Sequence, residues 1–347
     1  MRIAQVAPLF ESVPPKLYGG TERIVSYLTE ELHQQGHHVT LFASGDSETS
    51  AKLVSVWPTA LRLDRSEPEP VSLHVLEIEA AFRPSWDFDV IHFHIDAMQL
   101  PLARRQSTPV VTTLHGRLDL PGMKELYDEY QDMPLVSISN HQRSHMPTAA
   151  WADTVYHGLP TDLLRPSYTP GDYLAFLGRI SPEKRPDRAI AIAHRSGIPL
   201  RIAAKVDRAD QRYYESEIAR HIDGDFIRFD GEMSDARKGE FLRGARALLF
   251  PIDWPEPFGL VMIEAMACGT PVIAFNAGSV PEVIEDGVTG RIVDSVDDAV
   301  ARVAEMATWD RRVCRAAFEQ RFTAQRMALN YTKVYENLRK RQWSQSG

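Results

Sequence analysis

The sequence has few cysteines: only Cys268 and Cys314 occur among its 347 residues. Two isolated thiols provide neither the paired spacing of a zinc site nor the disulfide framework of a small secreted domain. They therefore favour a chain that works in a reducing, cytoplasmic environment.

A cluster of carboxylates for a metal ion is also lacking. Asp87 and Asp89 have the spacing of a metal-binding D-x-D pair, but they precede a predicted strand instead of following it. A solvated turn is the better interpretation of this pair, because aspartate is favoured in turns. We expect no metal site and no metal cofactor.

Neither long apolar runs nor an excess of positive charge is present. No stretch approaches the roughly 20 apolar residues that cross a bilayer, and Met1–Ile3 leads into a strand without the apolar core of a signal peptide. The formal net charge is −8. This charge disfavours a nucleic-acid partner and a broadly basic membrane-docking face, although it leaves peripheral membrane contact open.

The fingerprint G-x-G-x-x-G is missing too, so a dinucleotide cofactor is not expected. Gly19 and Gly20 stand instead between a strand predicted over 3–8 and a helix predicted over 21–35, with Glu22 just inside that helix. A glycine pair lets the backbone approach an anion at the start of a helix. An ordinary strand-to-helix turn would use the same pair, so this indication is weak on its own.

Two series of alternating strands and helices fill the chain. In the first half, strands are predicted over 3–8, 39–43, 90–94, 110–115 and 135–139. Beyond a stretch at 155–170 that is rich in proline, further strands are predicted over 173–177, 200–204, 226–229, 247–250, 272–275 and 291–293, with helices over 184–195, 211–222, 235–243, 259–267 and 297–306 between them. Such alternation is typical of parallel sheets covered by helices.

We therefore expect an α/β fold with two doubly wound, Rossmann-like domains. The N-terminal domain is predicted over 1–165 and the C-terminal domain over 166–325. A last segment, 326–347, contains a helix that can pack back across the domain boundary.

Polar residues stand at the carboxyl ends of three strands in the first half, where parallel sheets bind ligands. They are His92, His94, His115, Gly116, Ser137 and Ser139. His115 closes an apolar, β-branched strand and precedes Gly116, so both are candidate site residues. The alternative, a histidine satisfied within the core, stays equally open. Ser139 is a further candidate for substrate binding.

Cations follow the first two strands of the second half. Arg179 comes directly after the first of these strands and Lys184 five residues later. Both can reach one point beyond the carboxyl end of the sheet, where they would hold two linked phosphates. Basic residues in this place also cap or solvate the next helix, and alone that alternative would be preferred. Lys205 ends the next strand and is a candidate neighbour of a base or ribose.

The most informative stretch is 255–269. A proline-rich loop carries Glu256 and continues as an apolar helix in which Glu264 is the only charge. A helix that is apolar on every side is buried, and a buried carboxylate is costly unless donors reach it. A ligand diol would supply such donors, whereas the alternative is that Glu264 snorkels or pairs with an arginine. The amide groups at the helix start suit a phosphate; they belong to Phe258, Gly259 and Leu260.

Together these motifs resemble the family 4 retaining glycosyltransferases of GT-B architecture, and the resemblance covers almost the whole chain. Its most specific part is Glu256 followed after seven residues by Glu264, with a Pro-Phe-Gly-Leu run directly after Glu256. The run Asn276–Glu282 also matches the family. Tyr156–Pro160 departs from the more usual Asn-Gly-Ile-Asp, which leaves the contacts that close the two domains open.

The resemblance implies a GT-B fold whose two domains face a central cleft, with a nucleotide diphosphate sugar held mainly by the second domain. Arg179 and Lys184 would bind the diphosphate of this donor. Glu264 would bind the ribose hydroxyls, and Glu256 with the Phe258–Leu260 backbone would bind the hydroxyls of the sugar.

For the first domain, the resemblance implies that His115 lies near the transferred sugar and that Gly19 and Gly20 face the diphosphate or the acceptor. The implied activity moves a hexose from UDP-glucose, or as a second choice GDP-mannose, to a hydroxyl of a small molecule, a glycan or a lipid-linked acceptor. Two rivals remain: a sugar-nucleotide epimerase or phosphorylase of similar fold, and a non-catalytic sugar-nucleotide-binding subunit. The presence of both Glu256 and His115 disfavours the second.

Overall fold

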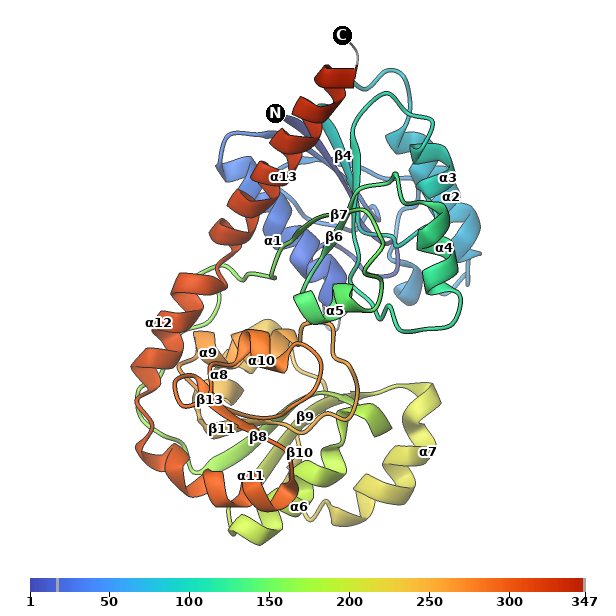
Figure 1. Cartoon of the computed structure of the whole chain (residues 1–347). Helices are drawn as coiled ribbons and strands as arrows, with labels where there is room; N and C mark the ends of the chain where they lie inside the picture. Colours follow the sequence, from blue (N-terminus) through green and yellow to red (C-terminus); the bar gives the residue numbers. More distant parts are fainter. Residues whose placement is uncertain (17–18, 346–347) are drawn as a thin grey trace. The chain divides into compact units, whose positions relative to one another are not determined.

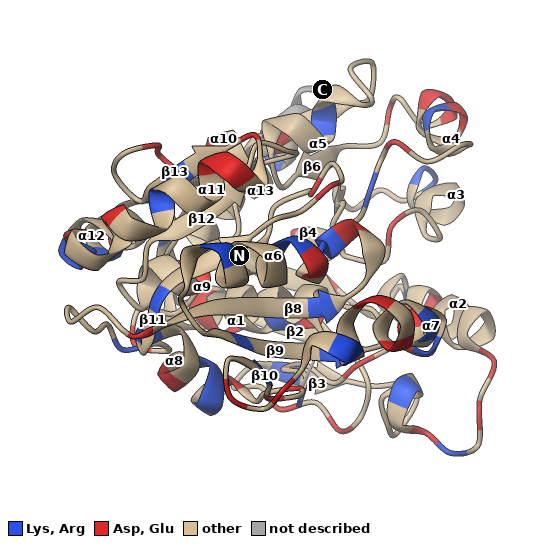
Figure 2. Ribbon diagram, turned by 90° about the horizontal axis from the view of Figure 1, so that it is seen from below, with Lys and Arg blue, Asp and Glu red and all other residues tan. Residues whose placement is uncertain are grey.

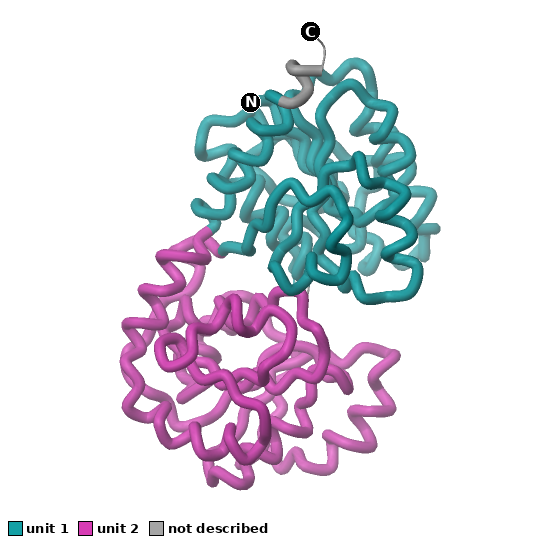
Figure 3. Tube along the Cα trace, in the orientation of Figure 1, with its two compact units in different colours: residues 1–158, 324–347 teal, residues 159–323 magenta. Residues whose placement is uncertain are grey.

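The computed structural model describes residues 1–16 and 19–345, with the backbone alone for residues 341–345. The chain forms two compact units, residues 1–158 together with 324–347, and residues 159–323 (Figure 3). Residues 346–347, the end of the expected last segment, lie outside the described residues. Each unit is built on one parallel sheet with helices around it (Figure 1).

The sheet of the first unit has seven parallel strands in the order β3-β2-β1-β4-β5-β6-β7. They are β1 (Arg2–Val6), β2 (His38–Phe42), β3 (Lys52–Val54), β4 (Val90–Phe93), β5 (Val110–Thr113), β6 (Leu135–Ser137) and β7 (Trp151–Thr154). The five inner strands confirm the predicted strands. Inner strands are buried on both faces and therefore have apolar sequences, which makes them recognisable. The sequence does not predict the edge strands β3 and β7, since each has a single neighbour and carries polar residues.

The helices of the first unit include the last helix of the chain. They are α1 (Gly20–Gln34), α2 (Pro70–Ala81), α3 (Leu100–Ala103), α4 (Met123–Glu129), α5 (Asn140–Ser144) and α13 (Ala324–Gln345). Helix α13 packs on α1 and buries the rings of Tyr331 and Tyr335. The first unit is therefore completed by residues that follow the second unit in the sequence.

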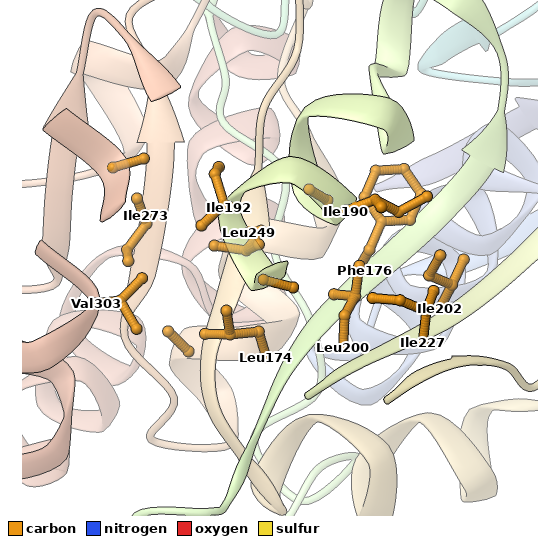
Figure 4. Packing of buried hydrophobic residues seen from close by; sticks show 14 of the residues in the cluster. Leu174, Phe176, Ile190, Ile192, Leu200, Ile202, Ile227, Leu249, Ile273 and Val303 are labelled. Atoms are coloured by element: carbon orange, nitrogen blue, oxygen red, sulfur yellow. The ribbon is translucent and has the colours of Figure 1, made fainter. Parts of the chain in front are cut away.

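The second unit contains a six-stranded parallel sheet in the order β10-β9-β8-β11-β12-β13. Its strands are β8 (Tyr173–Ile180), β9 (Leu200–Val206), β10 (Ile227–Phe229), β11 (Ala245–Phe250), β12 (Val272–Phe275) and β13 (Gly290–Val293). Figure 4 shows part of its core, where Ile190 and Ile192 of a covering helix meet apolar side chains of the sheet. All six predicted strands are confirmed.

The second unit also contains a set of α-helices. They are α6 (Pro186–Ser196), α7 (Gln211–Tyr213), α8 (Asp235–Arg243), α9 (Leu260–Ala267), α10 (Val280–Val283), α11 (Val296–Val303) and α12 (Arg311–Arg321). The prediction of one helix over 211–222 is wrong, because α7 continues as a π-turn (Tyr214–Ile218) and a 3-10 turn (Ala219–His221). Tyr213 and Tyr214, on either side of this change, both pack on the core of the second unit.

Helix α12 is tied to the second unit by two buried arginines. The guanidinium of Arg311 donates to the carbonyl oxygens of Ser167 and Ala245, both at 2.7 Å. Arg315 donates to the carbonyls of Leu164 and Thr161 at 3.0 and 2.8 Å. These contacts place residues 159–165 in the second unit, so the expected division at 165/166 lies within that unit.

The sequence predicts neither a broadly basic face nor an apolar stretch long enough to cross a bilayer. Figure 2 shows that helices of both units carry acidic and basic residues. Among the described helices, none combines the length and the apolar composition that a membrane span requires.

Candidate active site

A pocket of about 290 Å³ opens in the first unit. Its walls come from the segments after β1, β4 and β5, from the start of α1 and from α2. The lining residues are Pro8, Phe10, Thr21, Glu22, His74, His94, Ile95, Asp96, Met98, His115 and Gly116. The strand order reverses between β1 and β4, and open parallel sheets bind ligands at such a point. Three predicted site residues meet here: Glu22, His115 and Gly116.

His115 is partly buried and contacts two buried histidines, His94 and His157. Its Nε2 atom is 2.9 Å from Nδ1 of His94, and its ring stacks on that of His157 with 5.3 Å between centroids. Burial lowers the pKa of His115 to about 3, so the ring is neutral at physiological pH. The sequence gives no sign of the His157 contact, because the two residues lie in different loops.

The loop that carries His115 is held by Gln142 of α5. The side-chain amide of Gln142 donates to the carbonyl oxygens of Leu114 and Gly116, each at 2.9 Å. The hydroxyl of Ser139, a candidate for substrate binding, accepts a 3.0 Å hydrogen bond from the backbone N–H of Gln142 and caps α5. Ser139 does not line the pocket, and its described contact is structural.

The two glycines at the start of α1 lie outside the pocket. A Cβ atom on Gly19 would come within 2.7 Å of the Pro15 Cβ atom, so this position requires glycine. Gly20 is the first residue of α1. Neither glycine lines the pocket, which begins at the next two residues, Thr21 and Glu22.

Glu22 is a buried carboxyl group at the edge of this pocket. Its pKa is raised from 4.5 to about 7, mainly by burial and to a smaller extent by the neighbouring Glu11, while backbone hydrogen bonds oppose the shift. The folded chain therefore retains a proton on Glu22 at pH values where the unfolded chain has lost it.

This shift predicts a pH effect on stability. As the pH rises from 4.5 towards 7, the free energy of unfolding of the native protein should fall relative to that of Glu22→Gln, and the difference should stay constant above that range. Denaturant unfolding of both proteins across this range measures the effect. A difference that does not change with pH would show that Glu22 ionises normally.

In the second unit, Lys184 and Glu256 form an ion pair, 72 residues apart in the sequence. The indole of Trp254 donates to the same Glu256 oxygen at 2.9 Å, and the Lys184 ammonium lies 4.6 Å from the centre of the Trp254 ring. Lys184 ends a 3-10 turn (Pro182–Lys184) before α6, so the segments after β8 and β11 meet at this pair. The sequence predicts both charges but not the contact between them, nor the part of Trp254.

The loop that carries Glu256 is held in turn by the segment after β12. Ser279 donates from its amide to the Glu256 carbonyl at 3.0 Å and from its hydroxyl to the Phe258 carbonyl at 2.8 Å. A Cβ atom on Gly278 would lie 2.3 Å from the Glu256 nitrogen. This close approach gives a physical reason for the Ala-Gly-Ser run.

Helix α9 starts immediately after this loop. Gly259 has a φ of 81°, and a Cβ atom there would lie 2.8 Å from the Met262 methyl carbon. Leu260 opens the helix, and no side chain caps it. Phe258 is buried, so it is the backbone of this start that suits an anion.

Arg179 and Lys205 lie among acidic side chains. Arg179 pairs with Glu183 and is 3.8 Å from both Asp207 and Asp210. Lys205 pairs with Asp207, so the two cations share this carboxylate. A diphosphate at Arg179 must therefore compete with the protein's own carboxylates.

Glu264 is buried on α9, and its partner is Lys238 of α8. The Lys238 ammonium lies 3.0 Å from Glu264 and 3.2 Å from Asp235. The alternative in which Glu264 pairs with a cation is thus realised by a lysine instead of an arginine. The sequence predicts helix α8, but it does not show which face of that helix meets α9.

Comparison with known families decides the class of this chain. Residues 165–314 match the family model described as glycosyl transferases group 1, and residues 18–158 match glycosyltransferase family 4. The chain belongs to the family 4 glycosyltransferases. This glycosyltransferase is therefore an enzyme, and the resemblance seen in the sequence is confirmed.

Relatives of this glycosyltransferase match most of its length. It is 27% identical over 341 residues to the phosphatidyl-myo-inositol mannosyltransferase of Mycolicibacterium smegmatis, covering 88% of this chain and 84% of that protein. It is 27% identical over 392 residues to the D-inositol 3-phosphate glycosyltransferase of the same organism, covering 93% and 88%.

Solved structures share the fold of this glycosyltransferase. The structure of AviGT4, a glycosyltransferase involved in avilamycin A biosynthesis, matches with a TM-score of 0.77 and 25% identity, covering 98% of both chains. Sucrose-phosphate synthase from Thermosynechococcus elongatus matches with a TM-score of 0.79 and 20% identity, covering 97% of this chain and 98% of that one. The expected GT-B fold of two Rossmann-like units is thus confirmed.

Proposed function

We propose that this glycosyltransferase is a retaining hexosyltransferase that uses a nucleotide diphosphate sugar, with UDP-glucose as first choice and GDP-mannose as second. The observation that carries the proposal is the contact between Lys184 and Glu256. It joins a cation suited to a diphosphate with a carboxylate suited to sugar hydroxyls, directly before the start of α9.

The donor is held as follows in this proposal. Lys184 and Arg179 bind the diphosphate, and the Lys184 ammonium keeps Glu256 as a second partner because it has three donors. Glu264 accepts hydrogen bonds from the ribose. Glu256 and the start of α9 contact the hydroxyls of the sugar, and His115 of the first unit acts on the transferred sugar.

The proposed reaction breaks the bond between the anomeric carbon and the β-phosphate oxygen, and the electron pair leaves with the diphosphate. The acceptor oxygen attacks the same face of the sugar, and its proton passes to the departing phosphate. Fixed cations stabilise the growing negative charge more in the transition state than in the ground state. A double displacement would need a carboxylate against the opposite face of the sugar. We propose no Asp or Glu for that role, so same-face attack is preferred.

The acceptor is proposed to be a hydroxyl of a small molecule, a glycan or a lipid-linked molecule. Inositol compounds are the first to test, because two relatives are named for phosphatidyl-myo-inositol and D-inositol 3-phosphate. Mannose transfer by one of them also makes GDP-mannose a necessary arm of the donor test.

The test measures release of nucleoside diphosphate from UDP-glucose and from GDP-mannose, with and without a panel of inositol, glycan and lipid acceptors. We expect one donor to be consumed and a new glycoside with retained anomeric configuration to form only when an acceptor is present. Donor conversion without an acceptor would favour an epimerase or phosphorylase. Binding of the diphosphates without any turnover would favour a non-catalytic subunit.

We expect activity to persist in excess EDTA. Arg179, Lys184 and the start of α9 supply the positive charge that a Mg²⁺ ion would bring to the diphosphate. Initial rates with EDTA, and with Mg²⁺ or Mn²⁺ added back, should agree within about twofold. A twofold difference corresponds to only about 0.4 kcal/mol in the activation free energy. Loss of transfer in EDTA and its recovery with either metal would refute the assignment of Arg179 and Lys184.

A further inference from the structure

A network of buried polar side chains runs through the first unit behind His115. Gln5 of β1 lies at its centre and is fully buried. The Gln5 Oε1 atom is 2.9 Å from Nε2 of His94, and the Gln5 Nε2 atom donates to the Tyr335 hydroxyl at 3.0 Å. His94 then meets His115, with 2.9 Å between Nδ1 and Nε2. Gln5 therefore reaches His115 through a single imidazole.

The direction of each hydrogen bond follows from the atoms that Gln5 presents. An amide oxygen only accepts, so Nε2 of His94 must carry a proton and donate it to Gln5. A neutral imidazole has one N–H, which leaves Nδ1 of His94 as an acceptor. Nε2 of His115 must then donate to it, and Nδ1 of His115 is left with a lone pair.

The far side of the network agrees with this assignment. The Tyr335 hydroxyl accepts from Gln5 and can donate to Nδ1 of His92 at 2.8 Å. Nε2 of His92 then donates to the Thr113 hydroxyl at 2.7 Å. The Thr113 hydroxyl also forms a 3.0 Å hydrogen bond with the Tyr331 hydroxyl. Each of the imidazole rings of His92, His94 and His115 thus carries one N–H proton. Burial and mutual repulsion lower the pKa values of His92 and His94 well below the usual range, which keeps both rings neutral.

Nδ1 of His115 has no hydrogen-bond partner among the described residues. The atom is also buried. Its ring lines the pocket of the first unit. A buried acceptor without a partner is costly and therefore calls for a ligand donor.

We propose that Gln5 is a positioning residue that fixes the tautomer of His115, so that Nδ1 accepts a hydrogen bond from a hydroxyl of the transferred sugar. The sugar contact rests on the proposed function, whereas the tautomer does not. Reversing the Gln5 amide would invert the whole series: His94 would donate to His115, and Nδ1 of His115 would carry the proton. The two arrangements thus differ in which ring nitrogen of His115 carries the proton, and this can be measured.

The tautomer is read from the ring ¹⁵N shifts of the full-length protein, with the His115 signals assigned by their loss in His115→Ala. We expect Nε2 of His115 to be protonated and Nδ1 to be unprotonated. Gln5→Glu should preserve this state, because a carboxylate oxygen also accepts from His94. Gln5→Met, which has similar volume but no amide, should give a mixture of both tautomers. A proton on Nδ1 in the native protein would overturn the proposal.

Turnover of the donor tests the consequence. We expect Gln5→Met to lower kcat about tenfold, the effect of one lost hydrogen bond, and to leave the Kd for the nucleoside diphosphate unchanged. Gln5→Glu should recover most of the rate. Tyr331→Phe removes a hydroxyl at the far end of the network and serves as the control; both its tautomer and its rate should be native.

The two readouts separate the inference from the proposed function. If ¹⁵N shifts show the expected tautomer but neither hexose donor is consumed, the proposed function fails and the assignment to Gln5 stands. If the donor is consumed and Gln5→Met keeps both the native tautomer and the native rate, the assignment to Gln5 is wrong. Should Gln5→Met fail to fold, the native and Gln5→Glu spectra still decide the tautomer.

Discussion

Replacing Glu256 by glutamine is expected to reduce donor turnover by about 10- to 150-fold or more, with affinity for the nucleoside diphosphate nearly unchanged. The glutamine oxygen can still accept from Trp254 and Lys184, so the loop and the lysine should stay in place. What is lost is the charge that strengthens hydrogen bonds to the sugar. Calorimetry with the diphosphate and assays of donor turnover measure the two properties.

Glu264→Ala should give the opposite pattern. A ribose bound by this carboxylate would contribute hydrogen bonds to a charged group, so the diphosphate should bind about 10- to 150-fold more weakly. Lys238→Met is the matched control, because it breaks the 3.0 Å ion pair and leaves Glu264 in the chain. We expect this variant to retain most of the affinity.

The three variants Glu256→Gln, Glu264→Ala and Lys238→Met together distinguish the possible roles of the two glutamates. Equal losses of affinity in Glu264→Ala and Lys238→Met would mean that Glu264 acts only by holding Lys238. Lost diphosphate affinity in Glu256→Gln with native affinity in Glu264→Ala would reverse the proposed donor orientation. Circular dichroism and thermal unfolding must first show that all three variants fold, since unfolding damages every property together.

His115→Ala should lose most turnover, about 100-fold, with fold and diphosphate affinity retained. The ring lines the pocket and contacts His94 and His157, while Gln142 holds the loop through backbone carbonyls that the substitution leaves intact. Donor turnover and calorimetry measure the effect. His33→Ala, at an exposed position of α1, is a control for loss of a histidine. Native turnover in His115→Ala would return His115 to the role of a satisfied core residue.

Local patterns in the sequence predict the fold well where burial imposes a strict composition. Strand β12 and helix α8 have the predicted bounds, and α9 is buried as its apolar sequence requires. The edge strands β3 and β7 escape prediction, because one open side relaxes that requirement. The helix predicted over 211–222 is wrong, because α7 ends at Tyr213 and a π-helical segment follows, a change that the apolar pattern of the sequence does not indicate.

The candidate site was predictable as a set of residue types but not as a set of contacts. Lys184 and Glu256 are both marked by their neighbours in sequence, yet their ion pair joins segments after different strands. Lys238 and Gln142 sit on helices whose facing sides no local pattern reveals. Contacts of this kind depend on the tertiary arrangement, so the sequence alone leaves them open.

The route of the chain makes the second unit an insertion into the first. Its two ends meet, since the Leu159 amide donates to the Phe322 carbonyl at 2.9 Å, and the chain then returns to form α13. A fragment of residues 159–323 should therefore fold and be purified by itself. Cutting the protein after Thr323 would harm the other unit instead, by removing the tyrosines that bond to Gln5, His92 and Thr113. During synthesis we accordingly expect the interior of the first unit to stay incomplete until α13 has left the ribosome.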